Sequence, residues 1–400
     1  MPVVYLILLA VGLGDVAWWR WADRRSTVLP RRVVWRTLIA LFIGSQLVYL
    51  AYFVAAPKSA RRVHPWLPMP FIAMVYVWHL LVLPASLIGV GASKVVSGTK
   101  RLLTQIAHGS AVGPVVSRRQ AILGGAAVAA PPLLTLAGVA RAVPQLDHFR
   151  IRPMDLRVPG LPPNLDGLRI AHVSDIHVGR YIRRGLLPRI VEATNQLKAD
   201  LVLFTGDLID LSLADLDRGI EVMKQLDPRQ GLAIIEGNHD LIEDPDAFDG
   251  RMKAAGLPLL VDEAMTIAVR GERVQLLGMR WGTPGADRRR HAGEASFRAS
   301  LDRLLPRRES GAFPIVLAHH PHAFDMVAAA GLPLTLSGHT HGGQLMLSEA
   351  VGFGPVFFRY WSGLYRKGDS QLVVSNGVGN WFPLRVQAPA EIIALTLHAA

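Results

Sequence analysis

The sequence contains no cysteine, and this absence narrows the chemistry that the chain can carry. Disulfides, thiolate zinc sites and a cysteine nucleophile are excluded, so any metal site must be built from His, Asp, Glu and Asn. The glycine-rich phosphate loops G-x-x-x-x-G-K and G-x-G-x-x-G are also absent from the sequence. Nucleotide-binding folds that depend on those loops are therefore not expected.

Acidic residues are scarce in the first part of the chain. Residues 1–150 hold 16 Lys and Arg against 3 Asp and Glu, whereas residues 151–400 hold 27 against 28. The net charge of +12 therefore belongs to the first part, which is also the apolar part. Basic residues between apolar segments are topology signals, and the near-neutral second part has no basic face for a phosphate backbone. No nucleic-acid partner is expected.

Four apolar stretches are each about long enough to cross a hydrocarbon core, which needs roughly 20 helical residues. They are Pro2–Trp19, Val33–Ala56, Trp66–Ala92 and Ala121–Ala140. We expect residues 1–145 to form a transmembrane region with about four helices, and residues 146–400 to form a separate domain. A multi-pass protein of the cell membrane, in contact with membrane lipids, is the expected result.

The orientation follows from the basic residues of the three connecting loops, because positive charge is retained in the cytoplasm. The loops carry, in order, Arg20, Arg24, Arg25, Arg31, Arg32 and Arg36; then Lys58, Arg61 and Arg62; then Lys94, Lys100, Arg101, Arg118 and Arg119. Loops one and three are expected to be cytoplasmic, which places residues 146–400 outside the cytoplasm. The segment 117–123 also resembles a twin-arginine export signal, and that alternative gives the same location.

From Leu168 onward, short apolar runs alternate with helical stretches, which is typical of an α/β sandwich. The predicted strands are Leu168–Val173, Leu201–Phe204, Leu232–Ile235, Thr266–Val269, Val274–Met279, Ile315–Ala318, Leu334–Leu336, Leu372–Ser375 and Glu391–Leu397. The predicted helices are Leu186–Leu197, Leu213–Leu226, Asp246–Ala255, Glu294–Leu305 and Ala323–Ala330. The pattern favours two mixed sheets over one parallel sheet.

Polar clusters follow five of these strands, and the carboxyl ends of neighbouring strands converge in α/β folds. The residues expected to meet are Asp175, His177, Asp207, Asn238, His319, His339 and His341. They are ligands suited to zinc, manganese or iron, and a carboxylate such as Asp207 can bridge two ions. Any one of them could instead cap a helix, but five clusters in order predict two divalent metal ions. The glycines at 206, 237 and 338 are expected to allow unusual backbone angles.

The succession Asp-x-His, Gly-Asp, Gly-Asn-His-Asp, His and Gly-His-Thr-His resembles the calcineurin-like metallophosphoesterases over roughly residues 165–397, in their membrane-associated bacterial branch. That resemblance implies a four-layered α/β sandwich. It implies a first metal held by Asp175, His177 and His341, a second held by Asn238, His319 and His339, and Asp207 as the bridge. It also implies that His239 protonates the leaving group and is oriented by Asp240.

The expected function is hydrolysis of phosphate mono- or diesters by a metal-activated hydroxide, which needs no protein nucleophile. One alternative is an inactive metal-binding membrane receptor or assembly factor. Another is a transport or signalling protein with a regulatory phosphatase domain. Lipid-linked esters are among the expected substrates because Phe353–Trp361 is rich in aromatic residues. Glycine, proline and arginine break its periodicity, so it is expected to form a loop beside the site, with packing inside the sandwich as the alternative.

Overall fold

The computed structural model describes residues 2–27, 29–55, 67–108, 118–182, 185–282, 293–348 and 350–400. The chain divides into residues 1–143, which hold the predicted spans and are called the membrane unit, and residues 144–400, which hold the predicted metal ligands and are called the catalytic unit. Each unit is described by itself. The loop residues Lys58, Arg61, Arg62 and Ser117, which were used to predict topology, lie outside the described residues.

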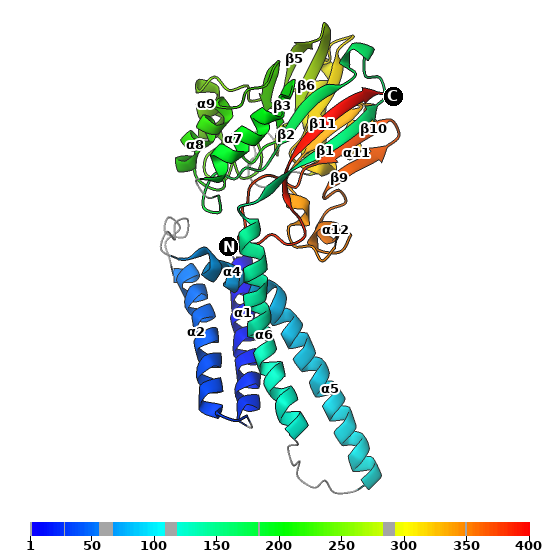
Figure 1. Ribbon diagram of the computed structural model, residues 1–400. Helices are drawn as coiled ribbons and strands as arrows, with labels where there is room; N and C mark the ends of the chain where they lie inside the picture. Colours follow the sequence, from blue (N-terminus) through cyan, green and yellow to red (C-terminus); the bar gives the residue numbers. More distant parts are fainter. Residues whose placement is uncertain are drawn as a thin grey trace. The chain divides into compact units, whose positions relative to one another are not determined.

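The membrane unit is helical (Figure 1). Its elements are α1 (Pro2–Ser26), α2 (Arg32–Ala55), α4 (Met69–Val77), the π-helical turn η1 (Trp78–Val82), α5 (Leu83–His108) and α6 (Arg118–Gln145), the last of which runs into the catalytic unit. Three segments are long and apolar enough to cross a membrane among the residues that the structure describes: Arg32–Tyr52, Met69–Thr99 and Ile122–Gln145. Helix α1 covers the first predicted span.

The interior of the membrane unit is mainly aromatic and aliphatic. Trp18, Phe42 and Trp78 pack edge to face, with ring centroids 4.9–6.4 Å apart. Against this cluster lies a buried carboxylate, that of Asp15. Trp78 Nε1 donates to one of its oxygens at 2.6 Å, and His79 Nε2 lies 2.9 Å from the other. The π-turn at η1 carries both of these partners, although they are consecutive in sequence.

The catalytic unit contains two mixed sheets, as predicted. The first has the order β1-β11-β2-β3-β4, with β1 (Phe149–Val158), β2 (Leu168–Val173), β3 (Leu201–Phe204), β4 (Gly231–Ile234) and β11 (Ala390–Ala399). The second has the order β5-β6-β7-β8-β10-β9, with β5 (Glu263–Val269), β6 (Glu272–Gly278), β7 (Phe313–Leu317), β8 (Leu334–Ser337), β9 (Gly363–Lys367) and β10 (Ser370–Val374). Within them, β2-β3-β4 and β6-β7-β8-β10 are parallel.

Helices cover the outer face of each sheet and complete the four layers. One core joins the first sheet to α7 (Leu186–Gln196), α8 (Leu216–Lys224) and α9 (Pro245–Ala254). Another joins the second sheet to α10 (Glu294–Leu304) and α11 (Phe324–Ala329). A third core, which includes Leu203, Leu276 and Leu336, lies between the sheets. The four-layered α/β sandwich is therefore confirmed.

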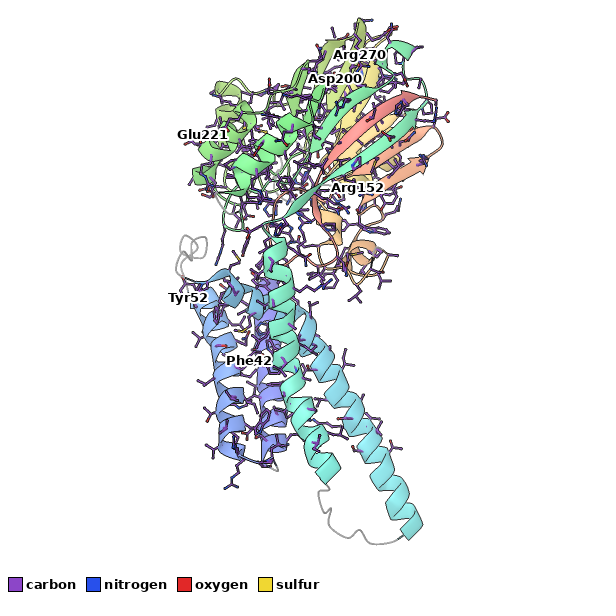
Figure 2. The ribbon with its side chains drawn as sticks, in the orientation of Figure 1. Phe42, Tyr52, Arg152, Asp200, Glu221 and Arg270 are labelled. Atoms are coloured by element: carbon purple, nitrogen blue, oxygen red, sulfur yellow. The ribbon has the colours of Figure 1, made fainter. Side chains whose placement is uncertain are left out.

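Short elements complete the chain. They are the 3-10 turns η2 (Pro163–Leu165), η3 (Leu213–Asp215), η4 (Leu305–Arg307), η5 (Pro321–Ala323) and η6 (His341–Gly343), and the five-residue helix α12 (Phe353–Phe357). An ion pair links the two sheets. Arg270 Nη2, in the β5–β6 turn, lies 3.0 Å from Oδ2 of Asp200, just before β3, and both residues are labelled in Figure 2.

Two strands were not predicted, β1 and β9. β1 is an edge strand with mostly exposed or half-exposed side chains, so its sequence has no continuous apolar run from which a strand could be predicted. Pro153 lies inside it, which an edge strand tolerates because one side of its backbone lacks a partner. β9, also at an edge, is a five-residue partner of β10 with exposed basic residues at its end.

Candidate metal centre

All seven predicted ligands lie in loops that follow parallel strands. Asp175 and His177 follow β2, Asp207 follows β3 and Asn238 follows β4 in the first sheet, whereas His319 follows β7 and His339 and His341 follow β8 in the second. Neighbouring parallel strands end at the same edge, and the two sheets stack on a shared core. The packing of the sheets, rather than local sequence, brings the two groups of loops together.

The backbone at these loops is strained. Five of the seven residues have left-handed backbone angles although none is glycine: Asp175 (φ 54°), His177 (φ 51°), Asp207 (φ 58°), His339 (φ 73°) and His341 (φ 49°). Such conformations cost free energy and persist where the surrounding structure imposes them, typically at functional sites.

Glycines let the same loops approach one another closely. Gly206 has φ 92°, as expected, and a Cβ there would collide with the backbone of Glu236 and Gly237. Gly338 does not have a left-handed angle; its role is contact, because a Cβ would overlap Ser174 and Asp175. The expectation of unusual backbone angles is thus correct for Gly206 and wrong for Gly237 and Gly338, which instead make room for neighbouring loops.

Asp175, His177 and His341 form the first cluster, and all three are buried. His177 Nε2 lies 3.0 Å from His341 Nε2 and 3.8 Å from Asp175 Oδ1, which is itself 3.3 Å from His341 Nε2. These separations are close to those between ligands that share one ion at about 2.0–2.2 Å. The residues therefore fit a divalent cation.

Asp207, His319 and His339 form the second cluster. His319 Nδ1 lies 2.6 Å from the Thr205 carbonyl oxygen and must donate to it, so in the neutral imidazole the lone pair is on Nε2. That Nε2 is buried without a hydrogen-bond partner and lies 3.2 Å from Asp207 Oδ2. Asn238 Oδ1 joins the cluster, 2.9 Å from His339 Nδ1. Oriented, unpartnered nitrogens are what a metal site requires.

Asp207 lies between the two clusters. Its Oδ2 is 3.5 Å from His177 Nε2 in the first cluster and 3.2 Å from His319 Nε2 in the second. Its Oδ1 accepts a hydrogen bond from the backbone N–H of His239 at 2.8 Å. This position is the one that a bridging carboxylate needs.

The charges around the centre keep Asp207 ionised, and they leave its histidines in two protonation states, neutral and protonated. Burial opposes ionisation of Asp207, but the neighbouring His319 and His239 outweigh it and hold its pKa well below the usual range. Burial lowers the pKa of His341 to about 4, so this imidazole is neutral. Burial also acts on His319, yet the Asp207 carboxylate raises its pKa to about 9, so cation binding there would release a proton.

His239 lies beside the clusters, with its ring centroid 4.6 Å from that of His177. Its Nδ1 lies 2.6 Å from the Asp210 carbonyl oxygen and 3.3 Å from the Asp210 carboxylate. Burial lowers the pKa of His239, but Asp207 and then Asp210 outweigh this effect and raise it to about 9. A protonated imidazole is thus held near the candidate centre.

Asp240 has different contacts from those implied by the family resemblance. Its carboxylate accepts the backbone N–H groups of Asp207, Ile209 and Gly237 at 2.9–3.0 Å, and it is 1% exposed. It therefore fixes the Asp207 loop to the Asn238 loop, and Asp210 is the residue that contacts His239. The sequence reasoning missed Asp210, whose only signal is its position three residues after Asp207.

Arg385 is a second residue that the sequence reasoning missed. It is fully buried, and its guanidinium lies 3.0 Å from His341 Nδ1. It also donates to the carbonyl oxygens of Asn376, Gly379 and Ala388 at 2.8–3.1 Å. The Gly-Val-Gly segment after β10 is thereby held against the first cluster. Nothing in the sequence distinguishes this arginine from the 42 other basic residues.

The aromatic stretch Phe353–Trp361 divides into three environments. Phe357 is 66% exposed on α12, where a loop was expected. Phe358 is half-buried beside the metal centre, 5.8 Å from His339 between ring centroids. Trp361 packs against Gly354 and Tyr365. The stretch therefore begins with a short helix rather than a loop, and none of its aromatic side chains is buried in the core of the sandwich.

Comparisons with known proteins agree with this geometry. The family model described as calcineurin-like phosphoesterase matches residues 168–343. A transmembrane protein with metallophosphoesterase domain from Danio rerio is 27% identical over 403 residues, which cover 97% of this chain and 87% of that one. The phosphodiesterase YaeI of Escherichia coli is 30% identical over 244 residues, covering 58% and 83%. The uncharacterized metallophosphoesterase YkuE of Bacillus subtilis is 28% identical over 296 residues, covering 71% and 98%.

The fold and the clustered ligands define a metallophosphoesterase, attached to helices that are apolar enough to span a membrane. The chain belongs to the calcineurin-like phosphoesterase family.

Proposed function

We propose that this protein is a membrane-bound hydrolase of phosphate mono- or diesters that works with two divalent cations. The convergence of two buried ligand clusters on Asp207 is the observation that carries the proposal. Asp175, His177 and His341 would hold one cation, and Asn238, His319 and His339 the other. Manganese, zinc and iron all suit this mixture of imidazole, carboxylate and amide oxygen.

Two cations bound there would supply a hydroxide at neutral pH and neutralise phosphoryl oxygens. The protein supplies the rest. His239 would donate a proton to the leaving oxygen, because its Nδ1 is fixed by the Asp210 carbonyl and its ring lies beside the first cluster. Asp240 would keep the Asp207 and Asn238 loops in register through three backbone hydrogen bonds.

The test is turnover by the purified full chain in detergent, first stripped of metal with a chelator and then supplied with manganese, zinc or iron. Bis(4-nitrophenyl) phosphate reports diesterase activity and 4-nitrophenyl phosphate reports monoesterase activity. We expect hydrolysis that depends on about two bound ions per chain. Two tightly bound ions without turnover of either ester would favour the alternative, an inactive metal-binding receptor or assembly factor.

A lipid-linked phosphate ester is the substrate class that we propose. Its support is the attachment of the catalytic unit to candidate membrane spans and the exposed aromatic and aliphatic side chains near the metal centre. The test compares two esters with the same headgroup, one acylated and one not. Phe357→Ser should lower hydrolysis of the acylated ester alone, whereas Trp361→Ser should lower both because Trp361 is packed.

An extracytoplasmic catalytic unit is the remaining part of the proposal, supported by the basic loops of the first 150 residues. Reporter fusions after residue 113 should behave as cytoplasmic, and fusions after Leu156 as extracytoplasmic. The reverse pattern would move the hydrolysis into the cytoplasm.

A further inference from the structure

The catalytic unit starts where a candidate membrane span ends. That span, Ile122–Gln145, is longer than the roughly 20 residues that cross a hydrocarbon core, so its last turn reaches the headgroup region. Leu146 is the next residue, and it is buried in the catalytic unit at 4% exposure. The chain thus has no free linker between the span and the folded unit.

Leu146 is hydrogen bonded to the loop that supports the candidate metal centre. Asn380 Nδ2 donates to the Leu146 carbonyl oxygen at 3.0 Å, and Asn380 Oδ1 accepts from Arg385 Nε at 3.1 Å. Arg385 in turn contacts His341. Two fully buried side chains therefore separate the anchoring residue from a predicted metal ligand.

A neighbouring loop, between η6 and β9, carries an exposed apolar lobe, defined by Leu347, Val351, Phe353, Val356 and Phe357. The backbone pairs residues 344–346 with Val386: Val386 N–H donates to Gln344 O at 2.9 Å, and Met346 N–H donates to Val386 O at 3.0 Å. A cavity of about 380 Å³ beside it is lined by Met346, Arg150 and Arg152 of β1, among others. Figure 1 shows α12 and the start of β1 at the same end of the catalytic unit, and Figure 2 labels Arg152 on this strand.

The lobe is exceptional in its exposure. Eight large apolar side chains are exposed among the described residues of the catalytic unit, and five of them form the lobe. Leu347 is 81% exposed, Val356 is 72% and Phe357 is 66%. Such a concentration in water is unfavourable and marks a surface that another apolar phase covers.

Helix α12 of the lobe packs against η6, the turn that begins at His341, because a Cβ on Gly343 would collide with the Gly354 backbone. Trp381, next to Asn380 in sequence, is 42% exposed, and its ring centroid lies 5.7 Å from that of His239 and 6.4 Å from that of His341. Exposed tryptophan side chains are typical of the membrane–water interface in membrane proteins.

We propose that the apolar lobe docks on the bilayer surface next to the anchor, so that the candidate metal centre faces the lipid headgroups. We take the bilayer as the phase that covers the lobe because the short covalent connection at Leu146 keeps this end of the catalytic unit within a few residues of the membrane. This inference adds to the proposed function by stating where a lipid-linked ester would enter. The statement about the ester rests on the proposed function, whereas the docking of the lobe does not.

The absence of cysteine allows a direct test in the full-length chain. Val356→Cys places one thiol on the lobe, and Ser310→Cys places a matched thiol on an exposed residue just before β7, at the strand end opposite the ligands. Each variant is labelled with an environment-sensitive fluorophore and reconstituted in phosphatidylethanolamine and phosphatidylglycerol vesicles. Headgroup-region nitroxide lipids and aqueous iodide are then used as quenchers.

We expect nitroxide lipid to quench the label at position 356 at least several-fold more than the label at 310, and iodide to show the opposite order. Iodide quenching at both positions, with none from lipid, would show a water-exposed lobe and overturn the proposal. Protection of position 356 from both quenchers would assign the lobe to a protein partner, such as a second copy, and would also overturn it. Neither readout depends on hydrolysis, so failure of the proposed function is separately detected.

Discussion

Each unit buries a carboxylate against histidine, and the two surroundings differ in how completely the polar atoms are paired. In the membrane unit, Asp15 is bonded on one oxygen by Trp78 and on the other by His79, whose second nitrogen contacts the Val75 carbonyl oxygen. In the catalytic unit, His319 Nε2 is buried without a hydrogen-bond partner and lies 3.2 Å from Asp207 Oδ2. Saturated polar groups stabilise packing, whereas converging unsaturated ones form a ligand site.

The hydrogen-bond partners of Asp15 explain why this carboxylate is tolerated among candidate membrane spans. Burying a carboxylate in an apolar bundle is costly unless its oxygens are hydrogen bonded. The π-turn supplies two hydrogen-bond partners from consecutive residues, which a regular helix would point about 100° apart. In the catalytic unit, by contrast, five of the seven predicted ligands have strained, left-handed backbone angles.

The largest effect is expected from Asp207→Ala, which removes the group common to both clusters. Bound metal should fall in both sites, and turnover of bis(4-nitrophenyl) phosphate should fall to background. Metal analysis and steady-state kinetics measure this, with Asp369→Ala in the exposed β9–β10 turn as the control. Normal metal stoichiometry and turnover in the Asp207 variant would remove this residue from the centre.

His239→Ala should keep both metals and lower turnover by roughly 10²–10⁴, the usual range for one general acid–base group. The comparison with Asp207 is direct, because His239 lies beside the clusters while Asp207 joins them. His398→Ala, near the chain terminus, serves as the control. A parallel loss of metal and turnover would make His239 a ligand instead.

Asp240→Ala should destabilise the catalytic unit, because three backbone N–H groups would lose their acceptor. We expect a cost of roughly 3 kcal/mol, at about 1 kcal/mol or more per unpaired group. That corresponds to a fall in Tm of roughly 6–12 °C. Asp240→Asn retains one acceptor oxygen and should lose less. An unchanged Tm with a large loss of turnover would instead make Asp240 part of the proton-transfer machinery.

Asp15→Leu tests the other side of the comparison and should have the smallest effect. The buried Trp78 N–H would lose its acceptor and His79 Nε2 would lose its partner, at a cost of about 1–3 kcal/mol to the membrane unit. The added substitution His79→Leu should recover part of this loss. Thermal unfolding in detergent measures both. Turnover should stay normal, and a loss of hydrolysis at full stability would show that the Asp15 cluster also serves the reaction.

Much of this protein could be predicted from its sequence. Alternation of apolar runs and polar clusters identified nine strands and five helices of the catalytic unit, because burial imposes a period on each element. The family motifs were evident because His, Asp and Asn, the residue types expected of metal ligands, recur at the ends of the predicted strands. Edge strands such as β1 were not predicted, because an edge strand buries few of its side chains.

Only the tertiary structure decided how the polar groups are paired. Asp240 and Asp210 are two aspartates of one loop pair, yet packing directs the first to backbone amides and the second to His239. Arg385, 44 residues from His341, contacts it through a loop whose path no local pattern encodes. Sequence thus determined which residues face a strand end or an apolar interior, because that depends on periodicity. The fold determined which of them meet, because hydrogen bonds and exposure depend on contacts between distant segments.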